Sequence, residues 1–187
     1  MMTMELIRRE VNQIQKRHGE PDPFRLCRVL DILLLMQAMG AYEGCCKGFY
    51  LVQSRIQMIV LNSDLSRPLQ RVILAHELGH AVLRHKSSSV RAFHDVKLFD
   101  KASRYEYEAN IFASEYLIAD AEVRELLKED LSFSDMARQL SVPEELLDFK
   151  LRTLRQLGCA EINPPLMAGG DFLKRVSCRK KHEHEMI

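Results

Sequence analysis

The chain has 187 residues, of which 47% are hydrophobic and 28% are charged, and its formal net charge is +1. A chain of this length can form one domain with a substantial core. The near-zero charge gives no sign of a polyanionic partner or an acidic substrate, and no apolar run approaches the roughly 18 residues that a membrane span needs.

The N-terminal part of the chain predicts two helices. Apolar residues recur at helical spacing over residues 4–18, which predicts an amphipathic helix that ends at Gly19. After a proline-containing break, residues 24–39 are so densely apolar that we expect a second helix there, largely buried.

The middle of the chain changes character. Two runs rich in β-branched and aromatic residues, 49–52 and 56–61, are separated by three residues and predict a β-hairpin. Ser66 can cap a helix that enters through the following proline and runs to about residue 85. A polar loop follows, and a further helix is expected over residues 103–118.

The C-terminal part is expected to be helical, with clear helix starts at residue 132 or 134 and at Pro143, and a stop at Gly158. We therefore expect a single domain, followed by a loose tail. Its parts are N-terminal helices (1–45), a sheet with the central helices (46–118), a C-terminal helical part (119–162) and the tail (163–187).

The cysteines indicate a reducing compartment. There are five of them, scattered through the chain, and none forms a C-x-x-C pair. This pattern favours a cytoplasmic protein and speaks against a zinc site built from cysteines.

The strongest chemical signal is the stretch HELGH at residues 76–80. Residues four apart on an α-helix lie on one face, so His76 and His80 can bind one ion, and neutral imidazoles suit Zn²⁺. Glu77 is rotated about 100° away on the helix, which places it to take a proton from a water at the metal. Gly79 leaves room between the two histidines for another backbone to approach.

Three fixed positions can also match by chance, and a core helix without a metal is the alternative. The surrounding residues are almost all apolar: Val72, Ile73, Leu74, Ala75, Leu78, Ala81 and Val82. Burying two imidazoles and a carboxylate without partners costs several kcal/mol, and a bound metal removes that cost. The apolar surroundings therefore favour the metal site.

A catalytic zinc site needs a third protein ligand and one open position. Metzincins place a third histidine six residues after the second, following a glycine. That position is Lys86 in this chain, and Leu83 stands where the glycine is needed, so this solution is excluded. His85 misses by one residue, and we expect it to be a helix-end residue near the C-terminal dipole.

A glutamate from a later helix is the other solution. Within RYEYEANIFASEYL, Glu106 falls inside the apolar face of the helix, whereas Glu108 falls at its far edge, where we expect solvation. Glu106 is therefore favoured over Glu108 as the third ligand. Asn110, one turn further on, faces the same side and could orient a ligand histidine through a hydrogen bond.

Taken together, these stretches resemble the ImmA/IrrE family of zinc metallopeptidases. The matching pieces are GFYLVQSRIQMIVLN, LAHELGHAVLRH and YEYEANIFASEYLI, in this order, and DMARQLSVPEELLDFKL also resembles the family. The resemblance spans roughly residues 46–155, and the ordered combination is far more specific than H-E-x-x-H alone.

The resemblance implies a gluzincin-like site, with His76, His80 and Glu106 as ligands of one Zn²⁺ per chain and Glu77 as the base. It implies an α+β, zincin-like fold that is mostly helical, with a small sheet or hairpin beside the active-site helix. Members of the family cleave a helix-turn-helix repressor of a mobile element or stress locus, so a protein substrate of that kind is expected. Ala119 is a departure, because members often have proline there.

The expected reaction is hydrolysis of a peptide bond, in which Glu77 accepts the proton of the attacking water and later delivers it to the leaving amine. A further donor should stabilise the oxyanion. The candidates for this role are His94, Tyr105, Tyr107 and Tyr116.

Two other functions remain open. Residues 132–150 have the spacing of a helix-turn-helix, which would make the chain a DNA-binding or scaffold protein. The second helix of that segment opens with PEELLD, whose acidic residues oppose binding to phosphates, so direct nucleic-acid binding is not expected. A catalytically silent metal-binding regulator is the second alternative, although it would have no need of Glu77. The histidines at 182–185 are expected to lie in a disordered tail.

Overall fold

The computed structural model describes residues 2–42, 44–85, 101–129 and 131–158. This part of the chain forms seven helices and three strands, which confirms the predicted α+β class, mostly helical with a small sheet. In chain order they are α1 (Met4–His18), α2 (Pro23–Val29), β1 (Leu33–Gln37), β2 (Gly48–Gln53), β3 (Ile56–Asn62), α3 (Arg67–Val82), α4 (Lys101–Leu117), α5 (Asp120–Leu126), α6 (Phe133–Gln139) and α7 (Glu144–Gln156).

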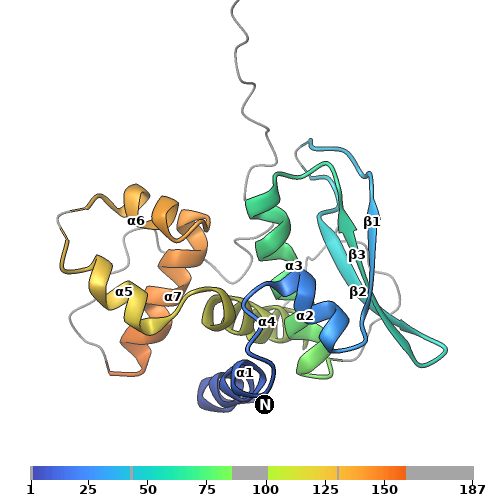
Figure 1. The fold of residues 1–187 in the computed structure, drawn as a ribbon, viewed down its shortest axis with the longest axis horizontal. Helices are drawn as coiled ribbons and strands as arrows, with labels where there is room; N and C mark the ends of the chain where they lie inside the picture. Colours follow the sequence, from blue (N-terminus) through green and yellow to red (C-terminus); the bar gives the residue numbers. More distant parts are fainter. Residues whose placement is uncertain (1, 43, 86–100, 130, 159–187) are drawn as a thin grey trace, which may run out of the picture.

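The sheet has the order β1-β3-β2 and lies beside α3 (Figure 1). Strands β2 and β3 form the predicted hairpin, and β1 pairs with β3 in parallel. The hairpin turn places Ser54 and Arg55 at φ values of 49° and 69°. Two consecutive positive φ values are the signature of a type I′ turn, whose twist matches that of the strands.

The helix predicted over residues 24–39 is wrong in its second half. Helix α2 stops at Val29, because Asp31 adopts a φ of 55° and the amide of Ile32 donates to the carbonyl of Cys27 at 2.8 Å. This Schellman motif redirects the chain into β1. The strand is also more exposed than expected, since Leu33 and Leu35 are 46% and 42% exposed.

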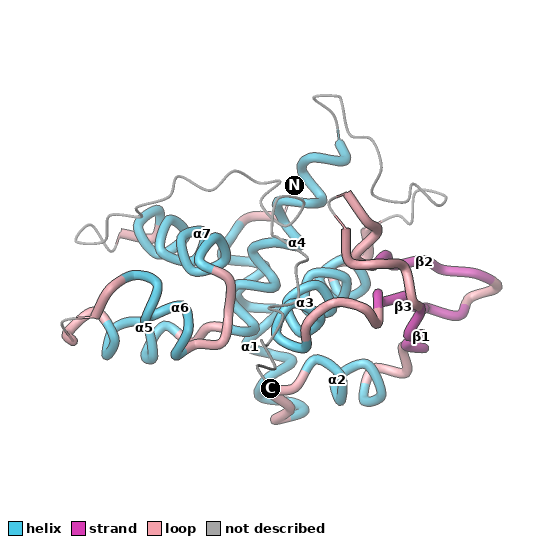
Figure 2. Tube along the Cα trace, turned by 90° about the horizontal axis from the view of Figure 1, so that it is seen from above, coloured by secondary structure: helices cyan, strands magenta, loops and turns pink. Residues whose placement is uncertain are grey.

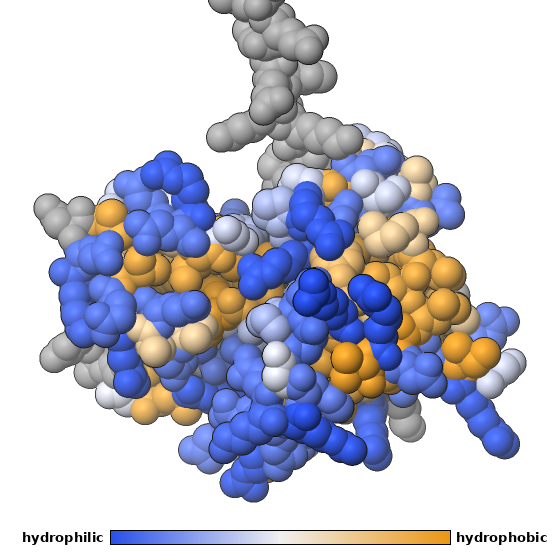
Figure 3. Space-filling model, in the orientation of Figure 1, coloured by the Kyte–Doolittle hydropathy of each residue, from blue (hydrophilic) through white to orange (hydrophobic). Residues whose placement is uncertain are grey.

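Apolar side chains consequently reach the surface over this edge of the sheet, and they are visible as an orange area in Figure 3.

Helix α4 runs through the middle of the molecule, with α3 and the sheet on one side and helices α5, α6 and α7 on the other (Figures 1 and 2). It packs against α1, α3 and α7. The predicted helix starts at Ser132 and Pro143 are confirmed as the residues that precede α6 and α7. Within the described ranges, no helix has the length and apolar character needed to cross a membrane.

A partly buried group of charges, with Lys150 fully buried at its centre, links the C-terminal helices to the rest of the protein. The ammonium of Lys150 on α7 lies 2.9 Å from Glu115 of α4 and 2.7 Å from Asp120 of α5. Arg8 of α1 also pairs with both carboxylates. Burial raises the pKa of Asp120, but the hydrogen bonds and charges of Lys150 and Arg8 outweigh burial and hold it below its usual value.

We expect Lys150→Met to lower the free energy of unfolding by about 3–5 kcal/mol, because it leaves two carboxylates with one remaining cation. The measurement is urea unfolding at neutral pH. Lys128→Met is the matched control, since the pair between Lys128 and Glu125 is exposed and its loss should cost less than about 0.5 kcal/mol. Equal losses in the two variants would contradict this role for Lys150.

Candidate metal centre

Helix α3 carries two histidines and a glutamate through the interior of the protein. It lies between the sheet on one side and α4 on the other, so that most of its residues are buried, His76 and Glu77 among them. Ser66 is the N-cap residue and Pro68 stands in the first turn, as expected from the sequence, although Ser66 makes no capping hydrogen bond through its side chain.

Gly79 lets α4 approach α3 closely. A Cβ atom at this position would lie 3.1 Å from the Cα of Ala109 and 3.2 Å from its carbonyl oxygen, so any side chain there would push the two helices apart by a few tenths of an ångström. The backbone that the sequence predicted to approach between the two histidines is therefore that of α4. This contact brings the first half of α4 over His76 and His80.

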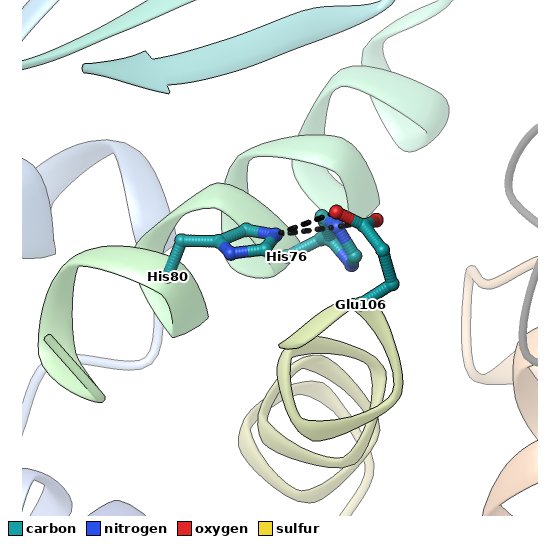
Figure 4. A group of neighbouring side chains, drawn as sticks. All are labelled: His76, His80 and Glu106. Carbon is teal, nitrogen blue, oxygen red and sulfur yellow. Dashed lines mark hydrogen bonds and ion pairs between the residues drawn. The ribbon is translucent and has the colours of Figure 1, made fainter. Parts of the chain in front are cut away.

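The structure brings together His76 and His80 of α3 and Glu106 of α4 (Figure 4). The Nε2 atoms of the two imidazoles are 3.1 Å apart. The carboxylate of Glu106 lies 3.2 Å from Nε2 of His76 and 3.5 Å from Nε2 of His80. One ligand atom from each residue lies within 4.8 Å of the others, which is the arrangement of a group that could hold one metal ion.

Asn110 lies within hydrogen-bonding distance of His76. Its side-chain oxygen lies 2.8 Å from Nδ1 of His76, and an amide oxygen can only accept, so Nδ1 carries the proton and donates it. In the neutral ring, Nε2 is then the unprotonated nitrogen, and it faces Glu106 and His80. This is the tautomer that a metal ligand needs.

The three ligand atoms of the group are better suited to bind a metal cation than to share a proton. Burial, with the charge of His76 as a smaller contribution, lowers the pKa of His80 to about 3, so its ring is neutral. Burial alone would lower the pKa of His76, but the hydrogen bond and charge of Glu106 raise it above its usual value. A single proton can bridge two of the three ligand atoms, whereas a divalent cation can accept electron pairs from all three.

Glu77 is buried beside this group and stays outside it. Burial raises its pKa to about 7, against the opposing effects of His76 and of a hydrogen bond from the backbone amide of Tyr50. Among the described residues, its Oε1 atom is buried and accepts no hydrogen bond. A carboxylate with a pKa near neutrality and one uncommitted oxygen is suited to accept and return a proton.

The four oxyanion candidates have different surroundings. The hydroxyl of Tyr116 donates to the carbonyl of Glu20, and the ring of Tyr107 packs edge-on against Phe149 of α7. Tyr105 stacks on His85, next to His80. His94 lies outside the described residues.

One expectation about the neighbouring residues is wrong. Glu108 was expected to be solvated, but it is buried and lies 3.0 Å from Nε2 of His85. His85 lies just past the end of α3, as expected, where its amide donates to the carbonyl of His80; its side chain is buried and lies 3.0 Å from Nδ1 of His80. Helical periodicity did not predict the burial of Glu108. Periodicity describes the faces of a single helix, whereas the partner of Glu108 is His85, which follows the end of α3.

The sequence is similar to a peptidase family and to proteins of a bacterium and a phage. A family model described as the IrrE N-terminal-like domain, Peptidase M78, matches residues 29–152. The "uncharacterized immunity region protein 2" of Bacillus phage phi105 is 30% identical over 145 residues, covering 78% of this chain and 89% of that protein. "Metallopeptidase ImmA" of Bacillus subtilis strain 168 is 26% identical over 147 residues, covering 78% of this chain and 83% of that protein.

Proposed function

Because the chain belongs to the peptidase family of the IrrE N-terminal-like domain, and is thereby a metallopeptidase, we propose that it is a zinc-dependent endopeptidase acting on a helix-turn-helix repressor. The observation that carries the proposal is the convergence of His76, His80 and Glu106 beside the buried Glu77.

The ligand set supports zinc as the metal. Two neutral imidazole nitrogens and one carboxylate are the ligands that catalytic zinc sites use, with one position left for water or substrate. Bound there, Zn²⁺ would supply a lowered pKa of water, towards about 7, and polarisation of the scissile carbonyl. The side chain of Glu106 is 26% exposed, so the group is accessible from solvent on this side.

Glu77 supplies the proton transfers. Its ionised carboxylate accepts the proton of the attacking water through Oε1, and the resulting acid then gives a proton to the leaving amine. A pKa near 7 suits both steps, because the group must be a base in the first and an acid in the second. Asn110 holds the ring of His76 in place throughout.

The substrate is inferred from the relatives. The phage relative is named as an immunity region protein and the bacterial one as the metallopeptidase ImmA. The name of the phage relative supports a role at a mobile element, the name of the bacterial one supports peptidase activity, and the ImmA/IrrE resemblance supports a repressor as the protein that is cut. A cytoplasmic location is part of this proposal and agrees with the reduced thiol of the buried Cys27.

The helix-turn-helix segment gives little support to DNA binding. Helix α7 would be the recognition helix, but much of it, including Leu146, Phe149 and Lys150, is buried within the protein. Its first turn contains Glu144 and Glu145, which would repel phosphates. Packing of α7 against α4 accounts for this segment without DNA.

The experiment is to incubate the zinc-loaded protein with the helix-turn-helix repressor encoded nearest to its gene and to measure intact masses. Two fragments whose masses sum to the repressor plus one water support the proposal, provided that a Glu77→Gln sample gives none. An intact repressor, with the protein shifting the mobility of operator DNA instead, would favour the DNA-binding alternative.

A further inference from the structure

A chain of hydrogen-bonding side chains, of which His85 and Glu108 are buried, lies behind His80. Nδ1 of His80 is 3.0 Å from Nδ1 of His85, and Nε2 of His85 is 3.0 Å from Oε2 of Glu108. The other carboxylate oxygen of Glu108 accepts from Nε of Arg104 at 2.9 Å. Four residues are thus linked in series, starting from a side chain of the candidate metal centre.

The direction of each hydrogen bond follows from what each group can do. The carboxylate of Glu108 can only accept, and its pairing with Arg104 keeps it ionised, so Nε2 of His85 donates to it. In a neutral His85, Nδ1 is then an acceptor, so Nδ1 of His80 must carry a proton and donate the hydrogen bond between the two rings. That leaves Nε2 of His80 unprotonated, facing Nε2 of His76 and the carboxylate of Glu106.

The backbone at the end of α3 places His85 for this contact. Arg84 has a φ of 54°, the amide of Arg84 donates to the carbonyl of Ala81, and the amide of His85 donates to the carbonyl of His80. This is a Schellman motif with a non-glycine residue in the left-handed position, which is a costly choice. It folds His85 back over the last turn of α3, where its ring stacks on Tyr105 at 4.5 Å between centroids.

From these contacts we propose that His85 and Glu108 are positioning residues, which fix the tautomer and orientation of His80 so that Nε2 is available to the metal. The inference rests on the proposed zinc site and adds two residues to it. His76 and His80 are then oriented by different partners, Asn110 for the first and the pair of His85 and Glu108 for the second. Partners of this kind typically change metal affinity 10–100-fold when they are removed.

The test is zinc affinity, measured by competition with a chromophoric chelator at fixed pH. His85→Leu should raise the Kd for zinc about 10- to 100-fold. His85→Gln should recover most of the affinity, because its amide oxygen can accept from His80 and its amide nitrogen can donate to Glu108. Thr153→Val is the matched control, since it breaks another buried hydrogen bond, on α7, and should leave the Kd for zinc unchanged.

A double-mutant cycle and a spectrum separate positioning from general destabilisation. Because His85 and Glu108 act in one chain, the variant that combines His85→Leu with Glu108→Leu should bind zinc no more weakly than His85→Leu alone. In the zinc-loaded protein, ¹⁵N spectra of the histidine rings should show the proton on Nδ1 of His80 and on Nε2 of His85.

Several results would overturn the inference. They are a Kd for His85→Leu within twofold of wild type, losses that add in the double variant, or a spectrum with the proton of His85 on Nδ1. If His85→Leu does not fold, Glu108→Leu and the wild-type spectrum decide the matter. A wild-type protein that binds no zinc would instead overturn the proposed function, so the two failures are distinguishable.

Discussion

A Glu77→Gln variant is expected to bind zinc as wild type does and to hydrolyse its substrate about 10²- to 10⁴-fold more slowly. Glutamine has nearly the same shape as glutamate but cannot accept the proton of the attacking water. The group of His76, His80 and Glu106 does not include residue 77, so its ligand atoms are unchanged. The measurement pairs zinc content with the rate of substrate cleavage.

The same variant has a stability signature in the metal-free protein. Burial raises the pKa of Glu77 from 4.5 to about 7, so ionised Glu77 destabilises the fold as pH rises through that interval. Above pH 7 the cost is fully present, and Glu77→Gln removes it. We expect the metal-free variant to be more stable than metal-free wild type at pH 8, by up to roughly 3 kcal/mol, with no gain at pH 4.

Activity and stability, measured together, distinguish a loss of proton transfer from a loss of folding. A slow variant that is also less stable at pH 8 would show that residue 77 is needed for folding. A stable, zinc-loaded variant with wild-type activity would remove Glu77 from the mechanism altogether.

A Glu106→Ala variant is expected to lose zinc affinity by more than the 10–100-fold that is typical of residues behind a ligand. The reason is that its carboxylate is the one oxygen donor in the group and the one donor contributed by α4. Competition with a chelator at fixed pH measures this loss. Activity should fall with zinc occupancy and return when excess zinc is supplied.

Glu108→Ala is the matched comparison, two residues along the same helix. It should weaken zinc binding less than Glu106→Ala does, because Glu108 reaches the group only through His85 and His80. If Glu106→Ala kept its zinc while Glu108→Ala lost it, the roles of the two glutamates would be exchanged.

Much of the site could be predicted because its signals are local. The spacing of His76 and His80 follows from one turn of one helix, and the choice of Glu106 follows from the apolar face of another. The hairpin of β2 and β3 is likewise a short-range feature, set by strand-forming residues on either side of a tight turn.

The errors occur where the chain turns without a glycine. Asp31 and Arg84 take positive φ values at the ends of α2 and α3, and in each case a Schellman motif redirects the following residues. The apolar run after Asp31 therefore becomes β1, whose partner is a strand more than 20 residues away. A short apolar run cannot be assigned to helix or strand from its own pattern, so the sequence did not predict the pairing of β1 with β3.

The same cause explains why the burial of His85 and Glu108 was not predicted. Periodicity assigns faces within a helix, but His85 lies beyond the end of α3, and its position depends on the turn at Arg84. Once that turn is made, His85 covers the side of α4 on which Glu108 lies and removes it from solvent. The sequence did contain a signal, an extra histidine in LAHELGHAVLRH, whose partner could be identified only in three dimensions.

The proposed function requires that His76, His80 and Glu106 hold one zinc ion per chain. The most direct test is metal content by mass spectrometry, on wild type and on His80→Ala, both purified without a histidine tag and then offered zinc at neutral pH. We expect one zinc per wild-type chain and a loss of that zinc in the variant. Wild-type protein without metal, or a His80→Ala variant that keeps a full equivalent, would contradict it.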